Sequence, residues 1–250
     1  MNSFLAALQF LTIVPIKISS LDGKKTAQSM AFFPLVGLLL GLALAGLNSL
    51  LTKCGFAQIS INIILVVALA ALTGGIHLDG LADTIDALSS AKKKEEMLAI
   101  MRDPHIGTMG VLGLAGILLL KIALISSLPL SIKISSLLLM CSLSRWSMVF
   151  ATFLFPYARQ EGKAKAFFKN INLRIFLLST LIALSCSVAT GGLPGIIVML
   201  CVALSAYLIA KLVSCQISGI TGDVLGAINE LSELVVLFMM CFLGKNLCVV

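Results

Sequence analysis

The sequence predicts an all-α protein, a polytopic integral membrane helical bundle that forms one domain over residues 1–250. Hydrophobic residues make up 59% of the chain and charged residues only 12%, whereas a soluble domain carries roughly 25% charged residues. The mean hydropathy is +1.10, apolar runs near the span length recur, and strand-like alternation and internal repeats are absent. In so apolar a chain, the net charge of +7 indicates basic cytoplasmic loops and not a nucleic-acid partner.

The first apolar run, residues 4–16, is too short to cross a bilayer and predicts a short N-terminal interfacial or re-entrant helix. The later runs approach the ~20 residues that a bilayer requires. We therefore expect about seven spans, at roughly 32–51, 59–76, 109–128, 134–155, 175–191, 194–213 and 231–250.

Loop charge predicts the orientation. If the spans alternate, only Lys53 and Lys133 fall on one side. The other side carries thirteen basic residues: Lys17, Lys24, Lys25, Lys92, Lys93, Lys94, Arg102, Arg159, Lys163, Lys165, Lys169, Arg174 and Lys211. The positive-inside rule makes this second side cytoplasmic.

The acidic residues are unevenly distributed. Two regions, 77–108 and 218–233, both on the predicted cytoplasmic side, hold nine of the eleven. Apart from Glu95 and Glu96, which follow the lysine run of a loop, these are Asp79, Asp83, Asp86, Asp103, Asp223, Glu230 and Glu233. An acidic side chain at the lipid-facing centre of a span costs ~2.5–3.5 kcal/mol, so grouping at one membrane face avoids that cost. We expect one active site at the cytoplasmic face, assembled from both regions.

The first region begins with His77 and an amphipathic pattern. In a helix, Asp79, Asp83 and Asp86 fall within an arc of about 60° on one face. Each close pair of like charges costs ~4 kcal/mol at an effective dielectric constant near 20. A bound hard cation such as Mg²⁺ would relieve this repulsion, and so would raised pKa values. A solvated acidic face is an equally good interpretation of these three residues alone.

The second half of this region combines charge with a helix start. Asp103 precedes Pro104, a typical N-cap pattern, so Asp103 alone is best interpreted as a cap for the third span. Arg102 and Gly107 lie beside the same helix N-terminus, whose amide groups suit a phosphate. His105 could act as a base or a phosphate ligand, although a lone histidine at this depth more often does neither.

The region 218–233 places carboxylates near and inside the last span. Gly219 and Gly222 allow a tight backbone turn before the helix. Asp223 and Glu230 are seven residues apart and share a face, and Glu233 lies about 80° round from Asp223. Because ionisable groups inside a span are functional by default, a functional role is the better interpretation here.

Arg145 lies in the middle of a predicted span. An arginine within the membrane needs a partner, which is either a carboxylate of the site or an anionic substrate. Structural pairing and phosphate binding both stay open.

These residues occur in a recognisable combination. The chain has Gly-Gly-Ile-His-Leu-Asp-Gly-Leu-Ala-Asp-Thr at 74–84, Ile-Met-Arg-Asp-Pro-His-Ile-Gly at 100–107, Ser-Arg at 144–145, Thr-Gly-Asp-Val-Leu-Gly-Ala at 221–227 and Glu-Leu-Ser-Glu at 230–233. Together they closely resemble the cobalamin synthase family, also called the adenosylcobinamide-GDP ribazoletransferases. The resemblance covers nearly the whole chain. The departures are Ile13 in place of a basic residue, Ala87 in place of glycine, and Ser218 where a second glycine is common.

The resemblance implies a magnesium-dependent transfer. A ribose hydroxyl of α-ribazole, or of α-ribazole 5′-phosphate, would attack the cobinamide-bearing phosphorus of adenosylcobinamide-GDP, and GMP would leave. The implied metal ligands are Asp79, Asp83, Asp86, Asp223, Glu230 and Glu233. The implied phosphate-binding residues are Arg102, Gly107, Arg145, Thr221 and Gly222. The implied catalytic residues are Asp103 and the two candidate bases, His77 and His105.

Two alternatives are weaker. A CDP-alcohol phosphotransferase would need an aspartate where this chain has Ile76, and Ala-Arg where it has Ala82-Asp83. A cation transporter would place its carboxylates near the bilayer midplane and usually shows internal repeats. The expected partners are small-molecule substrates and membrane lipid, and a homo-oligomer is left open.

Overall fold

The computed structural model describes residues 2–16, 22–162 and 164–247. The described residues form helices and no strand. In chain order the helices are α1 (Asn2–Leu11), α2 (Gly23–Ser29), η1 (Met30–Phe32), α3 (Phe33–Lys53), α4 (Gln58–Leu72), α5 (Ile76–Ser89), α6 (Lys94–Ile100), α7 (Thr108–Ser127), α8 (Leu130–Leu154), α9 (Lys165–Asn170), α10 (Leu173–Ile217) and α11 (Gly222–Leu247). Lys17, Lys163 and the end of the last predicted span, 248–250, lie outside the described residues.

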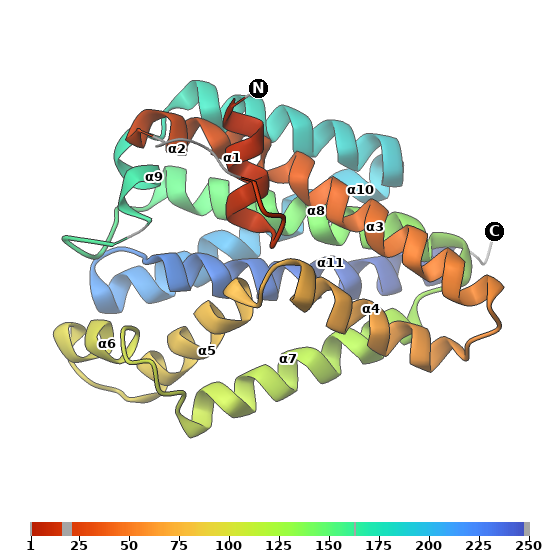
Figure 1. The fold of residues 1–250 in the computed structure, drawn as a ribbon, viewed down its shortest axis with the longest axis horizontal. Helices are drawn as coiled ribbons and strands as arrows, with labels where there is room; N and C mark the ends of the chain where they lie inside the picture. The colour runs from red at the N-terminus through yellow and green to blue at the C-terminus, as the bar shows by residue number, and fades with distance from the viewer. Residues whose placement is uncertain (1, 17–21, 163, 248–250) are drawn as a thin grey trace.

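The prediction of an all-α polytopic membrane protein is confirmed. Within the described residues, five helices are long and apolar enough to cross a membrane: Gly23–Lys53, Thr108–Ser127, Leu130–Leu154, Leu173–Ile217 and Gly222–Gly244. The bent pair α4–α5 is a sixth if it is counted as one span. Figure 1 shows α2, α6 and α9 at one end of the bundle and the α3–α4 connection at the other.

The second predicted span, 59–76, is shorter in the structure. Helix α4 ends at Leu72, and the chain then bends by 89° into α5. Gly74 and Gly75 make this bend with φ values of +63° and +69°, a left-handed backbone that glycine adopts without a steric cost. The acidic stretch 79–86 therefore lies on a separate helix, as the amphipathic pattern predicts.

Helix α10 contains two of the predicted spans, 175–191 and 194–213, separated by a break at Gly192 (φ 56°, ψ −137°). The Oγ atom of Ser187 lies 3.9 Å from the Sδ atom of Met199. A straight helix would separate these two residues by about 18 Å along its axis. The chain therefore reverses direction at this break, and its two halves pack against each other (Figure 1, cyan and light blue).

Helix α8 is the centre of the bundle. Every residue from Met140 to Val149 is buried, so the middle of α8 has no face open to lipid or water. Helices α3, α10 and α11 surround it. The α3–α8 contact is close because a Cβ atom on Gly41 would lie only 2.8 Å from the Cα atom of Leu138. Small residues at such positions let membrane helices pack backbone to backbone.

This packing predicts a position-specific effect of alanine on α3. Gly41→Ala should lower the free energy of unfolding by about 1–3 kcal/mol, because the added methyl group overpacks the α3–α8 contact. Gly46→Ala on the same helix is the matched control, since no atom lies within 4 Å of its Cβ position. Thermal unfolding in detergent measures both variants. Equal melting temperatures for the two would contradict the tight α3–α8 contact.

Candidate active site between α5 and α11

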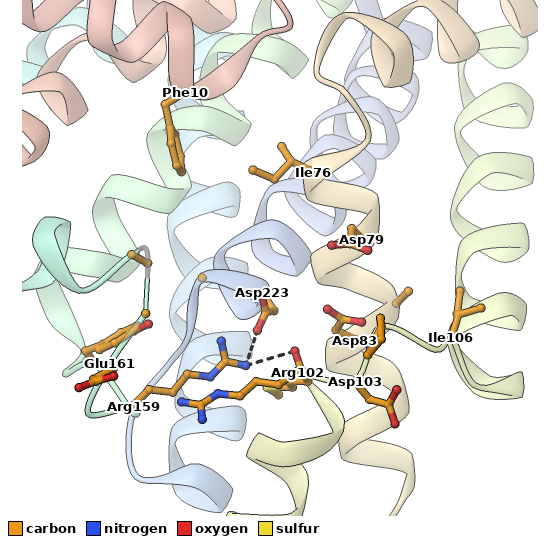
Figure 2. Close-up of a pocket in the computed structure, with 17 residues that line it drawn as sticks. Phe10, Ile76, Asp79, Asp83, Arg102, Asp103, Ile106, Arg159, Glu161 and Asp223 are labelled. Atoms are coloured by element: carbon orange, nitrogen blue, oxygen red, sulfur yellow. Dashed lines mark hydrogen bonds and ion pairs between the residues drawn. The ribbon is translucent and has the colours of Figure 1, made fainter. Parts of the chain in front are cut away.

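A cavity of about 750 Å³ opens where α5 meets the N-terminus of α11. Residues of the loop 101–106, of the segment 157–162 and Ala164 complete its wall. Its ionisable lining residues are Asp79, Asp83, Arg102, Asp103, Arg159, Glu161 and Asp223 (Figure 2). Its volume falls within the range of small-molecule sites. The structure thus brings together charged residues from the two regions that the sequence analysis singled out.

The α5–α11 contact depends on two glycines. A Cβ atom on Gly80 would lie 2.7 Å from the carbonyl oxygen of Asp223, and one on Gly226 would lie 3.3 Å from the Cα atom of Gly80. No side chain fits between the two backbones at these positions. The helices therefore approach closely enough for Asp79 and Asp83 of α5 to face the same cavity as Asp223 of α11.

The cavity carries more negative charge than its ion pairs neutralise. The Nη2 atom of Arg159 lies 2.6 Å from the Oδ2 atom of Asp223. The Oγ1 atom of Thr221 also donates a hydrogen bond to Oδ2 of Asp223 at 3.2 Å. No cation among the described residues forms an ion pair with Asp79 or Asp83. These two carboxylates therefore repel each other and attract a cation.

Arg159 is a site residue that sequence reasoning did not single out. Its position depends on pairing between the chain after α8 and the chain before α11. The N–H of Ala158 donates to the carbonyl of Ile220 at 3.0 Å, and the N–H of Ile220 donates to the carbonyl of Pro156 at 2.9 Å. Gly219 allows this pairing, because a Cβ atom there would lie 2.5 Å from the carbonyl oxygen of Pro156.

Asp86 and Gly107 differ from their predicted roles. The N–H of Gly107 donates to Oδ2 of Asp86 at 2.7 Å, and the N–H of Gly110 donates to Oδ1 at 2.8 Å. Both oxygens of Asp86 therefore bind the N-terminus of α7, and neither Asp86 nor Gly107 lines the cavity. The backbone amide groups that we expected to hold a phosphate instead hold α7 against α5.

Asp103 and His105 form a local pair in the loop before α7. The Nδ1 atom of His105 lies 2.7 Å from Oδ1 of Asp103, which also accepts the backbone N–H of His105 at 3.0 Å. These two hydrogen bonds, the backbone one first, lower the pKa of Asp103. Asp103 lines the cavity but does not cap α7, which begins at Thr108.

Neither candidate base reaches the cavity wall. The side chain of His105 is 89% exposed and contacts Asp103, but His105 itself does not line the cavity. His77 is buried, and its Nε2 atom has no hydrogen-bond partner among the described residues. The described lining residues of the cavity therefore include no histidine.

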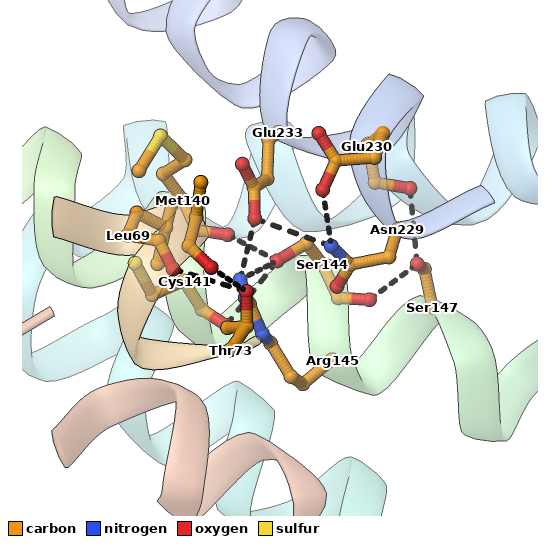
Figure 3. A network of polar contacts seen from close by, with 12 residues as sticks. Leu69, Thr73, Met140, Cys141, Ser144, Arg145, Ser147, Asn229, Glu230 and Glu233 are labelled. Atoms are coloured by element: carbon orange, nitrogen blue, oxygen red, sulfur yellow. Dashed lines mark hydrogen bonds and ion pairs between the residues drawn. The ribbon is translucent and has the colours of Figure 1, made fainter. Parts of the chain in front are cut away.

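The predicted metal ligands Glu230 and Glu233 and the predicted phosphate-binding residue Arg145 occur in a buried ion network (Figure 3). The Nζ atom of Lys121 lies 2.5 Å from a carboxylate oxygen of each glutamate, and Nη1 of Arg145 lies 2.5 Å from Oε1 of Glu233. The side-chain amide of Asn229 donates to Oε1 of Glu233 at 3.2 Å. The charges of Lys121 and Arg145 thus balance those of the two glutamates. None of these four side chains lines the cavity.

The predicted six-carboxylate metal shell therefore does not form as one group. In the part of the chain that the structure describes, no three histidine, cysteine, aspartate or glutamate side chains are arranged to hold a metal ion by themselves. Of the six predicted ligands, Asp79, Asp83 and Asp223 line the cavity. Of the predicted phosphate-binding residues, Arg102 and Gly222 line it, and Thr221 lies directly behind Asp223.

The fold and the cavity define a polytopic, all-helical membrane protein with a ligand site built from carboxylates and arginines. The chain belongs to the cobalamin-5-phosphate synthase family, whose model matches residues 3–241. It is 36% identical over 246 residues to an adenosylcobinamide-GDP ribazoletransferase of Desulforamulus reducens, covering 98% of both chains. It is also 36% identical over 240 residues to one of Escherichia coli, covering 94% of this chain and 97% of that one. No solved structure matches.

The buried network predicts a compensated pair of substitutions. Lys121→Met should lower the free energy of unfolding by about 3–5 kcal/mol, because it leaves two buried carboxylates facing one cation. Lys121→Met combined with Glu230→Gln should recover most of that loss, since the Arg145–Glu233 pair stays balanced. Denaturant unfolding in detergent measures both proteins. A double variant less stable than Lys121→Met alone would contradict a network based on charge balance.

Proposed function

We propose that this protein is an adenosylcobinamide-GDP ribazoletransferase, which performs the final assembly step of the cobalamin nucleotide loop. The observation that carries this proposal is the cavity that joins Asp79, Asp83 and Asp223 to Arg102 and Arg159. It occurs in a chain that matches relatives of that name over nearly its full length. Carboxylates and arginines together suit a diphosphate with its metal ion.

The proposed reaction exchanges a phosphoanhydride bond for a phosphodiester bond. A ribose hydroxyl of α-ribazole, or of its 5′-phosphate, attacks the phosphorus that bears the cobinamide. A bond from the ribose oxygen to this phosphorus forms, and the bond from the phosphorus to the bridging oxygen breaks. GMP leaves with that oxygen, and the hydroxyl proton passes to a carboxylate of the cavity. The product is adenosylcobalamin or its 5′-phosphate.

Asp79 and Asp83 would hold the Mg²⁺ ion together with phosphate oxygens of the substrate. The residues fit this ion because Mg²⁺ prefers oxygen ligands and is usually held by one or two carboxylates together with substrate phosphates. The unpaired charge of Asp79 and Asp83 supports the same assignment. When bound, the ion would neutralise charge on the diphosphate and its leaving oxygen.

The remaining cavity residues bind and orient the substrates. Arg102 and Arg159 donate hydrogen bonds to phosphate oxygens, and the pairing of Arg159 with Asp223 holds its guanidinium group in place. Neither His77 nor His105 lines the cavity, so we assign proton acceptance to a carboxylate of the cavity.

We place the cavity at the cytoplasmic face of a bacterial cytoplasmic membrane. The segment 157–162 lines the cavity, and α2, α6 and α9, which carry many of the basic residues, lie at one end of the bundle. Lys53, at the end of α3, lies at the other end. The positive-inside rule then orients the basic end inward.

The proposal predicts that Asp83→Asn lowers the rate of GMP release by about 100-fold or more, because the variant removes charge that holds the metal against the diphosphate. The assay uses purified protein, adenosylcobinamide-GDP, α-ribazole and Mg²⁺. Glu96→Gln is the control, since Glu96 is an exposed carboxylate paired only with Lys92 on the surface. Its rate should equal that of the unsubstituted protein.

Two outcomes would reject this proposal. Near-normal turnover by Asp83→Asn would remove the metal role of this residue. Cation flux into proteoliposomes without any GMP release would favour a transporter instead.

A further inference from the structure

A second cavity of about 510 Å³ adjoins the first. Three residues, Arg102, Arg159 and Glu161, line both cavities. The residues that line only the second one come from α6 and from the loop after α8; they include Lys94, Glu95 and Gln160. The shared arginines therefore form a wall with a ligand-sized space on each side of it.

We propose that this second cavity is the subsite for the departing guanine nucleotide, with Glu95 as the residue that recognises the base. This inference rests on the proposed function. It adds where the departing nucleotide binds and which residue recognises its base. Arg102, Arg159 and Lys94 supply three positive charges for the phosphate. Glu95 lines the second cavity and not the first. The base would therefore lie in the second cavity, beyond the shared wall.

The chemistry of guanine selects a carboxylate. The N1–H and the N2 amino group of guanine are adjacent donors, and one carboxylate can accept hydrogen bonds from both. Adenine has an acceptor at N1 and no amino group at C2, so the same carboxylate finds no donor pair. Two carboxylates line the second cavity, but Glu161 belongs to the wall shared with the first cavity, whereas Glu95 lines the second cavity alone. A ligand that is anionic at its phosphate and a hydrogen-bond donor at its base would match the cationic residues and Glu95 together.

The in-line geometry of the reaction also places the leaving nucleotide on the side of the second cavity. In a phosphoryl transfer the attacking and leaving oxygens lie roughly in line, on opposite sides of the phosphorus. Figure 2 shows Phe10 and Ile76 on one side of the carboxylates and Arg102 and Arg159 on the other. The aromatic base of α-ribazole suits the apolar side, where stacking on Phe33 holds Phe10 in place. The nucleotide then leaves toward the arginines and the second cavity.

The test measures equilibrium binding of GMP and AMP to the full-length protein by calorimetry. Glu95→Gln should weaken GMP binding by about tenfold or more, the value of a charge-assisted hydrogen-bond pair, and leave AMP binding unchanged. Lys94→Gln should weaken GMP and AMP by the same factor, because both carry the phosphate. Glu96→Gln, the neighbour of Glu95 that lines neither cavity, should bind both nucleotides like the unsubstituted protein.

The outcomes separate this inference from the proposed function. If Glu95→Gln keeps the GMP-to-AMP affinity ratio while GMP release proceeds normally, the subsite is overturned and the function stands. If Glu95→Gln loses GMP selectivity but the unsubstituted protein releases no GMP from adenosylcobinamide-GDP, the subsite stands and the function fails. Loss of GMP affinity in Glu96→Gln equal to that in Glu95→Gln would also overturn the role of Glu95.

Discussion

The direct backbone contact between α5 and α11 is the constraint on which the site depends. Gly80 and Gly226 leave no side chain between the two helices, so the carboxylates of α5 reach the cavity that Asp223 lines. The Gly74–Gly75 bend supplies the other half of this arrangement, because it turns α5 away from the direction of α4. A continuous helix through residues 59–89 would carry its acidic face out along the membrane normal instead of against α11.

Charge balance then separates the acidic residues into two groups. Glu230 and Glu233 face Lys121 and Arg145 in a buried network, where each charge has an opposite charge within hydrogen-bonding distance. Buried charges are stable in a membrane protein only with such partners. This network joins α7, α8 and α11 behind the cavity and holds α11 in a fixed register. The network therefore holds α11 beside the cavity without lining it.

The sequence predicted what depends on local pattern. The shared face of Asp79 and Asp83 follows from helical periodicity, and the all-helical membrane fold follows from hydropathy. The Arg159–Asp223 pair could not be predicted, because it depends on backbone pairing between segments more than 60 residues apart in the chain. Lys121 was overlooked for a similar reason: inside an apolar run its role depends on which helix packs beside it. Asp86 has the right spacing for the acidic face, but the amides of Gly107 and Gly110 bind its carboxylate.

The glutamates of the network have cationic partners, whereas Asp79 and Asp83 of the cavity do not. This difference in pairing explains why we place the proposed chemistry at one end of the bundle. Carboxylates with full partners have little remaining attraction for a cation, whereas Asp79 and Asp83 keep theirs because no described cation pairs with them. Arg159 pairs with Asp223 alone and so organises one carboxylate without neutralising the cluster. In the proposed function, a divalent cation would offset the charge of the carboxylates, and its own charge would add to the attraction that the arginines have for a phosphate-bearing ligand. This added attraction would couple metal binding to substrate binding in the cavity.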